Sequence, residues 1–200
     1  MNRINTLVFD IGNVLSHFCF EGIAAEAVRY TNLPIPAIQK VLIQWSHPFC
    51  LGELEEADFA KHCLEDLRFT GTAEDLKRAY NSGFTPNKVM RAVIERYASH
   101  YALYYLSDTN AWHLEHLLTH DPLLPHFKGG TTSIEVGVLK PNTAIYERAS
   151  KVHGFSPSQA VFIDDREANV ASAEAVGFTG LRYEPDRHAD FEQQLSALLK

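Results

Sequence analysis

Four short segments of the chain carry side chains that can do chemistry, and each borders a regular element. The first is Leu7-Val8-Phe9-Asp10-Ile11-Gly12, where an apolar run ends in a carboxylate and a glycine follows two residues later. Ligands of open parallel α/β sheets bind at the carboxyl ends of strands, so a carboxylate there faces a ligand rather than the core. Glycine lets the backbone approach a ligand closely. The structural alternative is an aspartate that starts a turn.

A second apolar run, residues 160–163, ends in the adjacent carboxylates Asp164 and Asp165. Mg²⁺ and other hard cations take oxygen ligands, commonly one or two carboxylates together with phosphate oxygens and waters. Two acids at a strand end that face a third acid repel one another without a cation. A turn rarely needs both. The pair therefore predicts a cation site near Asp10.

The two remaining segments favour an anion. Ser107 and Asp108 follow the apolar run 102–106 and precede a predicted helix, whose N-terminal N–H groups attract negative charge. Helix capping by Ser107, Asp108, Thr109 or Asn110 explains this segment equally well. Lys140 stands directly before Pro141 at another predicted helix start, where its charge opposes the helix dipole unless an anion is bound. The alternative for Lys140 is a solvated surface lysine.

The elements that must position these residues alternate between strands and helices. Strands are predicted at residues 4–10, 102–106, 160–163 and 178–182, with a short strand or irregular passage near 128–137. Helices are predicted near 21–31, 35–45, 56–68, 73–82, 87–99 and 111–120, then one opened by Pro141, one ending near Val176 and one from about 188. The order predicts an α/β fold, a doubly wound parallel sheet with helices on both faces. It brings all four segments to one edge of the sheet.

Composition limits the class of protein. Two hundred residues suit one α/β domain with a small insertion. The formal charge of −7 argues against nucleic-acid or membrane surfaces, which reward clustered Lys and Arg. The three cysteines form no C-x-x-C pair and are typical of reduced structural thiols. With no signal-peptide core and no spanning segment, we predict a cytoplasmic protein.

The order of these motifs resembles the haloacid dehalogenase-like hydrolase superfamily, in particular its small phosphatases with a helical cap inserted after the first motif. The resemblance spans Phe9 to Val14, Leu106 to Asn110, Gly137 to Pro141 and Ile163 to Asp165 with Asn169. It implies a Rossmann-like core made of residues 1–15 and 86–200, with residues 16–85 as the cap.

The resemblance also implies roles for the four segments. Asp10 would be the nucleophile that forms an aspartyl-phosphate, and the catalytic Lys140 would hold the phosphoryl oxygens together with Ser107. Asp108 would lie among these substrate-binding residues. Mg²⁺ would be held by Asp10, the Gly12 carbonyl, Asp164 and Asp165.

Two positions depart from the pattern of the superfamily. Most of its phosphatases carry a second aspartate two residues after the nucleophile as general acid and base, whereas this chain has Gly12. Protonation of the leaving group then needs another donor. Related sugar phosphatases commonly have asparagine where this chain has Asp108. One interpretation makes Asp108 the displaced proton donor.

Other candidate residues favour structural interpretations. His113, His116 and His120 share a helical spacing, but no Cys or acid completes a tight ligand set, so a solvated helix face is predicted. Trp45, His47 and Phe49 are expected in a cap loop, where core packing is at least as good an explanation as a sugar platform.

The sequence therefore predicts a Mg²⁺-dependent phosphatase of a small phosphorylated metabolite, with sugar phosphates among the candidates. The main enzymatic alternative is a 2-haloacid dehalogenase, which uses the same aspartate attack without metal. A catalytically silent binding protein with this fold is the other alternative, favoured by Gly12 and Asp108. Neither the substrate nor the oligomeric state can be predicted from the sequence.

Overall fold

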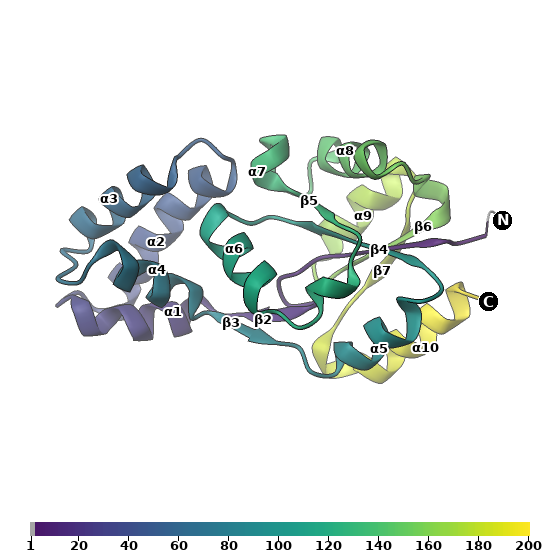
Figure 1. Cartoon of the computed structure of the whole chain (residues 1–200), viewed down its shortest axis with the longest axis horizontal. Helices are drawn as coiled ribbons and strands as arrows, with labels where there is room; N and C mark the ends of the chain where they lie inside the picture. Colours follow the sequence, from purple (N-terminus) through teal and green to yellow (C-terminus); the bar gives the residue numbers. More distant parts are fainter. Residues whose placement is uncertain (1–2) are drawn as a thin grey trace.

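The computed structural model describes residues 3–200, and within them five strands form a sheet in the order β5-β4-β1-β6-β7 (Figure 1). Every neighbouring pair in this sheet is parallel. The strands are β1 (Thr6–Phe9), β4 (Ala102–Ser107), β5 (Gly130–Thr132), β6 (Ala160–Asp164) and β7 (Thr179–Arg182). The predicted α/β fold is confirmed.

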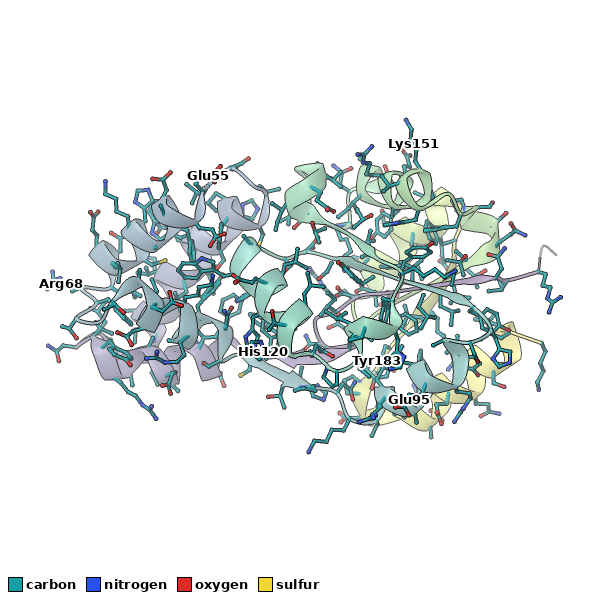
Figure 2. All side chains as sticks on the ribbon, viewed as in Figure 1. Glu55, Arg68, Glu95, His120, Lys151 and Tyr183 are labelled. Atoms are coloured by element: carbon teal, nitrogen blue, oxygen red, sulfur yellow. The ribbon has the colours of Figure 1, made fainter. Side chains whose placement is uncertain are left out.

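Helices cover both faces of this sheet because its strands bury side chains on both faces. They are α5 (Met90–Tyr97) and α10 (His188–Leu198) on one face and α8 (Thr143–His153) and α9 (Glu167–Val176) on the other (Figure 1). The outer faces of these layers carry charged side chains such as Glu95 and Lys151, which are exposed (Figure 2).

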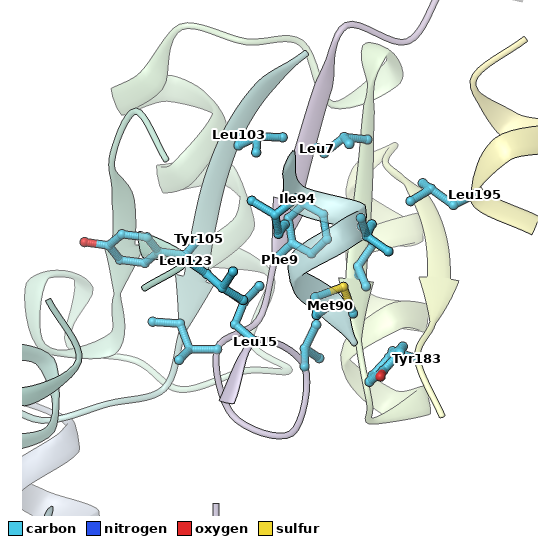
Figure 3. Packing of buried hydrophobic residues seen from close by; sticks show 14 of the residues in the cluster. Leu7, Phe9, Leu15, Met90, Ile94, Leu103, Tyr105, Leu123, Tyr183 and Leu195 are labelled. Atoms are coloured by element: carbon cyan, nitrogen blue, oxygen red, sulfur yellow. The ribbon is translucent and has the colours of Figure 1, made fainter. Parts of the chain in front are cut away.

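Side chains of β1 point alternately to the two faces of the sheet and enter two separate hydrophobic clusters. Leu7 and Phe9 pack in one cluster with Met90 and Ile94 of α5 and Leu195 of α10 (Figure 3). Val8, between them in sequence, belongs to the opposite cluster, which includes residues of α8 and α9. Because successive strand residues point to opposite faces, this four-residue strand contributes to both layers.

Along the chain, a helical insertion lies between β1 and β4, the next strand of the five-stranded sheet. It consists of α1 (Phe20–Ala27), α2 (Ile35–Cys50), α3 (Glu56–Asp66) and α4 (Ala73–Asn81). These helices share a hydrophobic cluster of their own, to which the sheet-bearing part adds Trp112 of α6 (Ala111–His120). The insertion lies beyond the carboxyl ends of the strands (Figure 1).

Two short strands that the sequence analysis missed connect the insertion to the sheet. They are β2 (Ser16–Phe18) and β3 (Phe84–Pro86), which pair antiparallel to each other. Three-residue strands carry too little periodicity to be recognised, and their pairing depends on contacts between distant segments.

Two predicted helix boundaries are wrong. The helix predicted to end near residue 45 continues through Pro48 to Cys50, so Trp45, His47 and Phe49 lie in α2 and not in a loop. Phe49 stacks on Phe59 with ring centroids 4.3 Å apart, and this packing outweighs the proline penalty. Pro141 does not open a helix, because α8 begins at Thr143 with Asn142 as its N-cap.

The remaining described elements are short. They are the helix α7 (Ser133–Val136) and the 3₁₀ turns Val28–Tyr30, Leu124–His126, Pro157–Gln159 and Pro185–Arg187.

Among residues 3–200, a helix with the length and apolar character of a membrane span is not found.

Gly130 of β5 offers a test of packing beside the site. A Cβ there would lie 2.1 Å from Cδ2 of the Tyr105 ring, on the neighbouring strand. Gly130→Ala is expected to lower the free energy of unfolding by about 1–3 kcal/mol, as overpacking usually does. Urea denaturation measures the change.

The control for this variant is Gly22→Ala in α1, where the nearest atoms to a new Cβ lie 3.9 Å away. It is expected to raise stability by roughly 0.5–1 kcal/mol, because alanine is the better helix residue. Equal stabilities for the two variants would show that Tyr105 moves aside at little cost.

Candidate active site

The candidate catalytic residues lie at the carboxyl ends of three adjacent strands. Asp10 directly follows β1, Ser107 ends β4 and Asp164 ends β6. Phe9 pairs in register with Tyr105 of β4 and with Ile163 of β6, so the following residues emerge side by side. The predicted meeting of distant motifs at one edge of the sheet is what the structure shows.

Lys140 lies at the centre of this edge. Its Nζ is 2.9 Å from Asp10 Oδ1 and 2.8 Å from Asp164 Oδ2, and it donates a hydrogen bond of 3.1 Å to the Leu106 carbonyl. Its side chain is only 1% exposed, so the alternative of a surface lysine is wrong. Burial alone would lower the pKa of Lys140, but the surrounding carboxylates of Asp10 and Asp164 raise it, so the ammonium stays charged.

Asp10 is held through one of its two oxygens. Oδ1 accepts the Ile11 N–H at 2.7 Å in addition to its contact with Lys140. Within residues 3–200, no hydrogen bond to Oδ2 is found, so that oxygen is open to a ligand. Burial raises the pKa of Asp10 to about 7, with Lys140 opposing the rise and Asp164 adding to it. A cation or a further positive charge would favour the ionised form.

Asp164 is fully buried and satisfied by neighbours on both oxygens. Asn169 Nδ2 donates to Oδ1 and Oδ2 at 3.0 Å each, and the Arg166 N–H donates to Oδ1 at 2.8 Å. Asn169 belongs to the fourth sequence motif, but no role for it was predicted. Its signal was its position five residues after Asp164, as the third residue of α9, in the helical turn next to the strand end.

Asp10, Asp164 and Asp165 together form a group that can hold a metal ion. Each offers one carboxylate oxygen, and these oxygens lie within 4.8 Å of one another. Asp165 is partly buried and accepts a 3.3 Å hydrogen bond from Asn13 Nδ2. Burial raises the pKa of Asp165, and the adjacent Asp164 raises it further. Oxygen donors crowded in this way fit Mg²⁺, which would relieve their repulsion.

A cavity of about 170 Å³ lies between this edge and the helical insertion. Gly12, Ser107 and Asp108 line it from the site, while Phe18, Phe20, Ser46, Cys50, Tyr80 and Phe84 line it from the insertion and its two connecting strands. Asn110, His113 and Leu117 line it from α6 and the turn before it. Gly12 contributes no side chain to this wall.

Asp108 lies in the cavity wall in a fixed orientation. Its Oδ1 accepts the backbone N–H of Lys140 at 2.9 Å. It does not cap α6, because Asn110 takes that position and accepts the His113 N–H at 3.0 Å. The capping interpretation therefore holds for Asn110 and is wrong for Asp108.

The three histidines of α6 differ in environment, which corrects the prediction of a solvated face. His113 is buried, His116 is half-buried and His120 is exposed. His113 Nε2 lies 3.3 Å from the Tyr80 carbonyl, and Asn110 Nδ2 lies 3.1 Å from Nδ1. Because a carbonyl only accepts, Nε2 carries the proton. Burial lowers the pKa of His113 to about 3, so the ring is neutral.

The polar network around His113 was missed by the sequence analysis. It joins Asn110 and His113 of the sheet-bearing part to Tyr80 and Ser46 of the insertion. Asn110 Nδ2 donates to the Tyr80 hydroxyl at 3.2 Å, and that hydroxyl lies 2.6 Å from Ser46 Oγ. No local sequence pattern links residues so far apart in the chain.

Comparison with known proteins decides the family. A family model described as haloacid dehalogenase-like hydrolase matches residues 4–177. The chain belongs to the haloacid dehalogenase-like hydrolases. The family resemblance predicted from the four motifs is therefore confirmed.

Several known proteins are similar to this chain over most of its length. D-ribitol-5-phosphate phosphatase of Bacteroides thetaiotaomicron is 26% identical over 210 residues, covering 98% of each chain. A family enzyme of the same organism, solved with magnesium and inorganic phosphate, has a TM-score of 0.79 at 20% identity and covers 91% of this chain and 95% of its own.

Dehalogenases of the family share the fold as well. L-2-haloacid dehalogenase of Xanthobacter autotrophicus has a TM-score of 0.65 at 19% identity, covering 98% of this chain and 84% of its own. A likeness at such identity concerns the fold, so the choice between phosphate and haloacid chemistry depends on the site.

Proposed function

We propose that this haloacid dehalogenase-like hydrolase is a Mg²⁺-dependent phosphatase that acts on a small phosphorylated metabolite through an aspartyl-phosphate at Asp10. The observation that carries the proposal is the placement of buried Lys140 between Asp10 and Asp164, with Asp165 within metal-binding reach. The 26% identical relative named as a phosphatase supports the same class of reaction.

The metal site of this proposal consists of the carboxylates of Asp10, Asp164 and Asp165 with the Gly12 carbonyl. A Mg²⁺ ion held there would supply positive charge to the transferring phosphoryl group. A cation among three carboxylates is of less use to a dehalogenase, whose electrophile is a carbon atom. The site thus favours phosphate over haloacid chemistry.

The protein residues of the site have separate tasks in this reaction. The Oδ2 atom of Asp10 attacks phosphorus, because Oδ1 is held by Ile11 and Lys140. The ammonium of Lys140 offsets the repulsion between this carboxylate and the phosphate dianion, and Ser107 binds a phosphoryl oxygen beside it. The transferred group then leaves Asp10 by hydrolysis.

We propose that residues 16–85 form a cap domain that selects the leaving group, on a core of residues 1–15 and 86–200. A cavity of about 170 Å³ is small beside the roughly 300 Å³ at which pockets for drug-sized ligands begin. Aromatic rings of Phe18, Phe20 and Phe84 line it, and such rings pack against the C–H faces of sugars and polyols. Sugar and polyol phosphates are therefore the substrate class to test.

The test is hydrolysis of p-nitrophenyl phosphate and of a panel of sugar and polyol phosphates, including D-ribitol 5-phosphate. Activity is expected with added Mg²⁺ and is expected to disappear with EDTA. Chloride release from 2-chloropropionate, measured in parallel, would instead identify a dehalogenase. An absence of both activities would indicate a silent binding protein.

Asp165→Asn tests the metal site by itself. Asparagine keeps the shape and one oxygen but removes a negative charge, so Mg²⁺ affinity is expected to fall by about 10-fold or more. Isothermal titration with MgCl₂ measures it. Asp186→Asn, an exposed carboxylate far along the chain, is the matched control and should bind like wild type. Equal affinities for the two variants would place the metal elsewhere.

A further inference from the structure

The proposed reaction needs a proton for the oxygen of the leaving group, and the site as described lacks an obvious donor. Gly12 has no titratable side chain, and a Cβ built there would meet no atom within 4 Å. The attacking Asp10 must be ionised, and Lys140 is occupied by two carboxylates. The donor must therefore be sought in the wall of the cavity that receives the leaving group.

Four titratable side chains line that cavity, and three of them are unsuited to proton transfer. His113 has both ring nitrogens in hydrogen bonds, and burial lowers its pKa to about 3. Burial raises the pKa of the Cys50 thiol to about 11. Burial also raises the pKa of Tyr80, whose hydroxyl is hydrogen-bonded to Ser46 and Asn110. General acids work best with a pKa near the operating pH.

Asp108 is the fourth group, and its geometry suits the task. The Lys140 N–H holds Oδ1, which fixes the side chain, while no described residue hydrogen-bonds to Oδ2. Burial raises the pKa of Asp108; Lys140 opposes this, Asp164 adds to it and Arg166 opposes it. A carboxyl with a raised pKa, fixed through Oδ1 and with Oδ2 open, therefore lines the cavity that receives the leaving group.

We infer that Asp108 is the general acid and base of this enzyme, a role that depends on the phosphatase function proposed above. As Asp10 forms its bond to phosphorus and the bond from phosphorus to the leaving oxygen breaks, the proton of the Asp108 carboxyl passes to that oxygen. The product departs as an alcohol and Asp108 remains as a carboxylate. It then takes a proton from the water that attacks the aspartyl-phosphate, which releases phosphate and restores both aspartates.

Asp108→Asn is the decisive variant, because the amide oxygen still accepts the Lys140 N–H while the transferable proton is lost. Burst rates of the first turnover, measured with substrate in excess over enzyme, are compared for two esters. One is p-nitrophenyl phosphate, whose phenolate leaves without a proton, and the other is an alkyl ester, glycerol 3-phosphate or whichever polyol phosphate the wild type hydrolyses. The alkyl ester is expected to react about 10²-fold more slowly than with wild type. The p-nitrophenolate burst should keep its rate, and slow turnover should follow it.

The outcomes separate this inference from the proposed function. A wild-type enzyme that hydrolyses neither ester overturns the phosphatase function and the role of Asp108 together. A wild type active on both, with an Asp108→Asn variant that slows both burst rates equally or neither, overturns the role of Asp108 alone. Asp186→Asn serves as the control and should leave all rates unchanged.

Gly12→Asp in the Asp108→Asn background should restore part of the rate on the alkyl ester, because the space at Gly12 is open.

Discussion

Replacement of Asp10 by asparagine is expected to reduce phosphate release by a factor on the order of 10⁴–10⁶, as removal of a nucleophile does in other enzymes. The amide cannot form the proposed acyl-phosphate bond. The fold should survive, because the Asn oxygen can still accept the Ile11 N–H and Lys140 keeps its 2.8 Å contact with Asp164. Phosphate release with saturating Mg²⁺ measures the effect.

Two measurements accompany this variant. The thermal unfolding midpoint should stay close to that of wild type, which separates lost chemistry from lost structure. Acid-quenched wild-type enzyme incubated with ³²P-labelled substrate should carry label that the Asp10→Asn protein lacks. Phosphate release at the wild-type rate by Asp10→Asn would rule out an aspartyl-phosphate at this position.

Lys140→Met is expected to affect both stability and activity. Without the ammonium, Asp10 and Asp164 face each other as buried carboxylates that have lost their cation. Breaking a buried ion pair in this way typically lowers the free energy of unfolding by about 3–5 kcal/mol. Loss of charge stabilisation at the phosphoryl group should lower kcat by about 10²–10³-fold. Urea denaturation and steady-state kinetics measure the two effects.

Mg²⁺ and pH should modulate the stability loss of Lys140→Met in predictable directions. Mg²⁺ binds the folded protein, so it should recover part of the lost stability. A carboxyl whose pKa is raised by folding binds protons more tightly in the folded state, so lowering the pH stabilises the fold. The difference in the free energy of unfolding between Lys140→Met and wild type should therefore shrink as the pH falls from 8 towards 5.

The control for Lys140→Met is Lys151→Met on the exposed face of α8 (Figure 2). Substitution of an exposed lysine is expected to change the free energy of unfolding by no more than about 0.5 kcal/mol. If Lys140→Met were as stable as Lys151→Met, the two carboxylates would not be ionised together in the folded protein.

The meeting of the catalytic motifs at one edge of the sheet could be predicted from the sequence, because each motif is a short local pattern at the end of a strand. Asp10, Ser107 and Asp164 each end an apolar run, and the carboxyl ends of parallel strands share one edge of a sheet. Placement of these residues required only that the strands be recognised and paired in parallel.

Other features of the site could not be predicted in this way. Whether Lys140 was a surface residue or a buried one depended on contacts with Asp10 and Asp164, which lie in distant parts of the chain. The spacing of His113 with its neighbours on α6 suggested a solvated face, whereas packing against Tyr80 buries it, with ring centroids 4.2 Å apart. The course of α2 through Pro48 was likewise decided by the packing of Phe49.

The sequence by itself determined the α/β alternation, the residue types at the strand ends and, through them, the family. The tertiary structure alone decided which oxygen of Asp10 is held and which acids surround Lys140. It also decided that the carboxyl of Asp108 lines the cavity. The physical reason is one of range. Hydrophobic periodicity and capping act within one element, whereas desolvation and ion pairing depend on whatever the fold brings within a few ångströms.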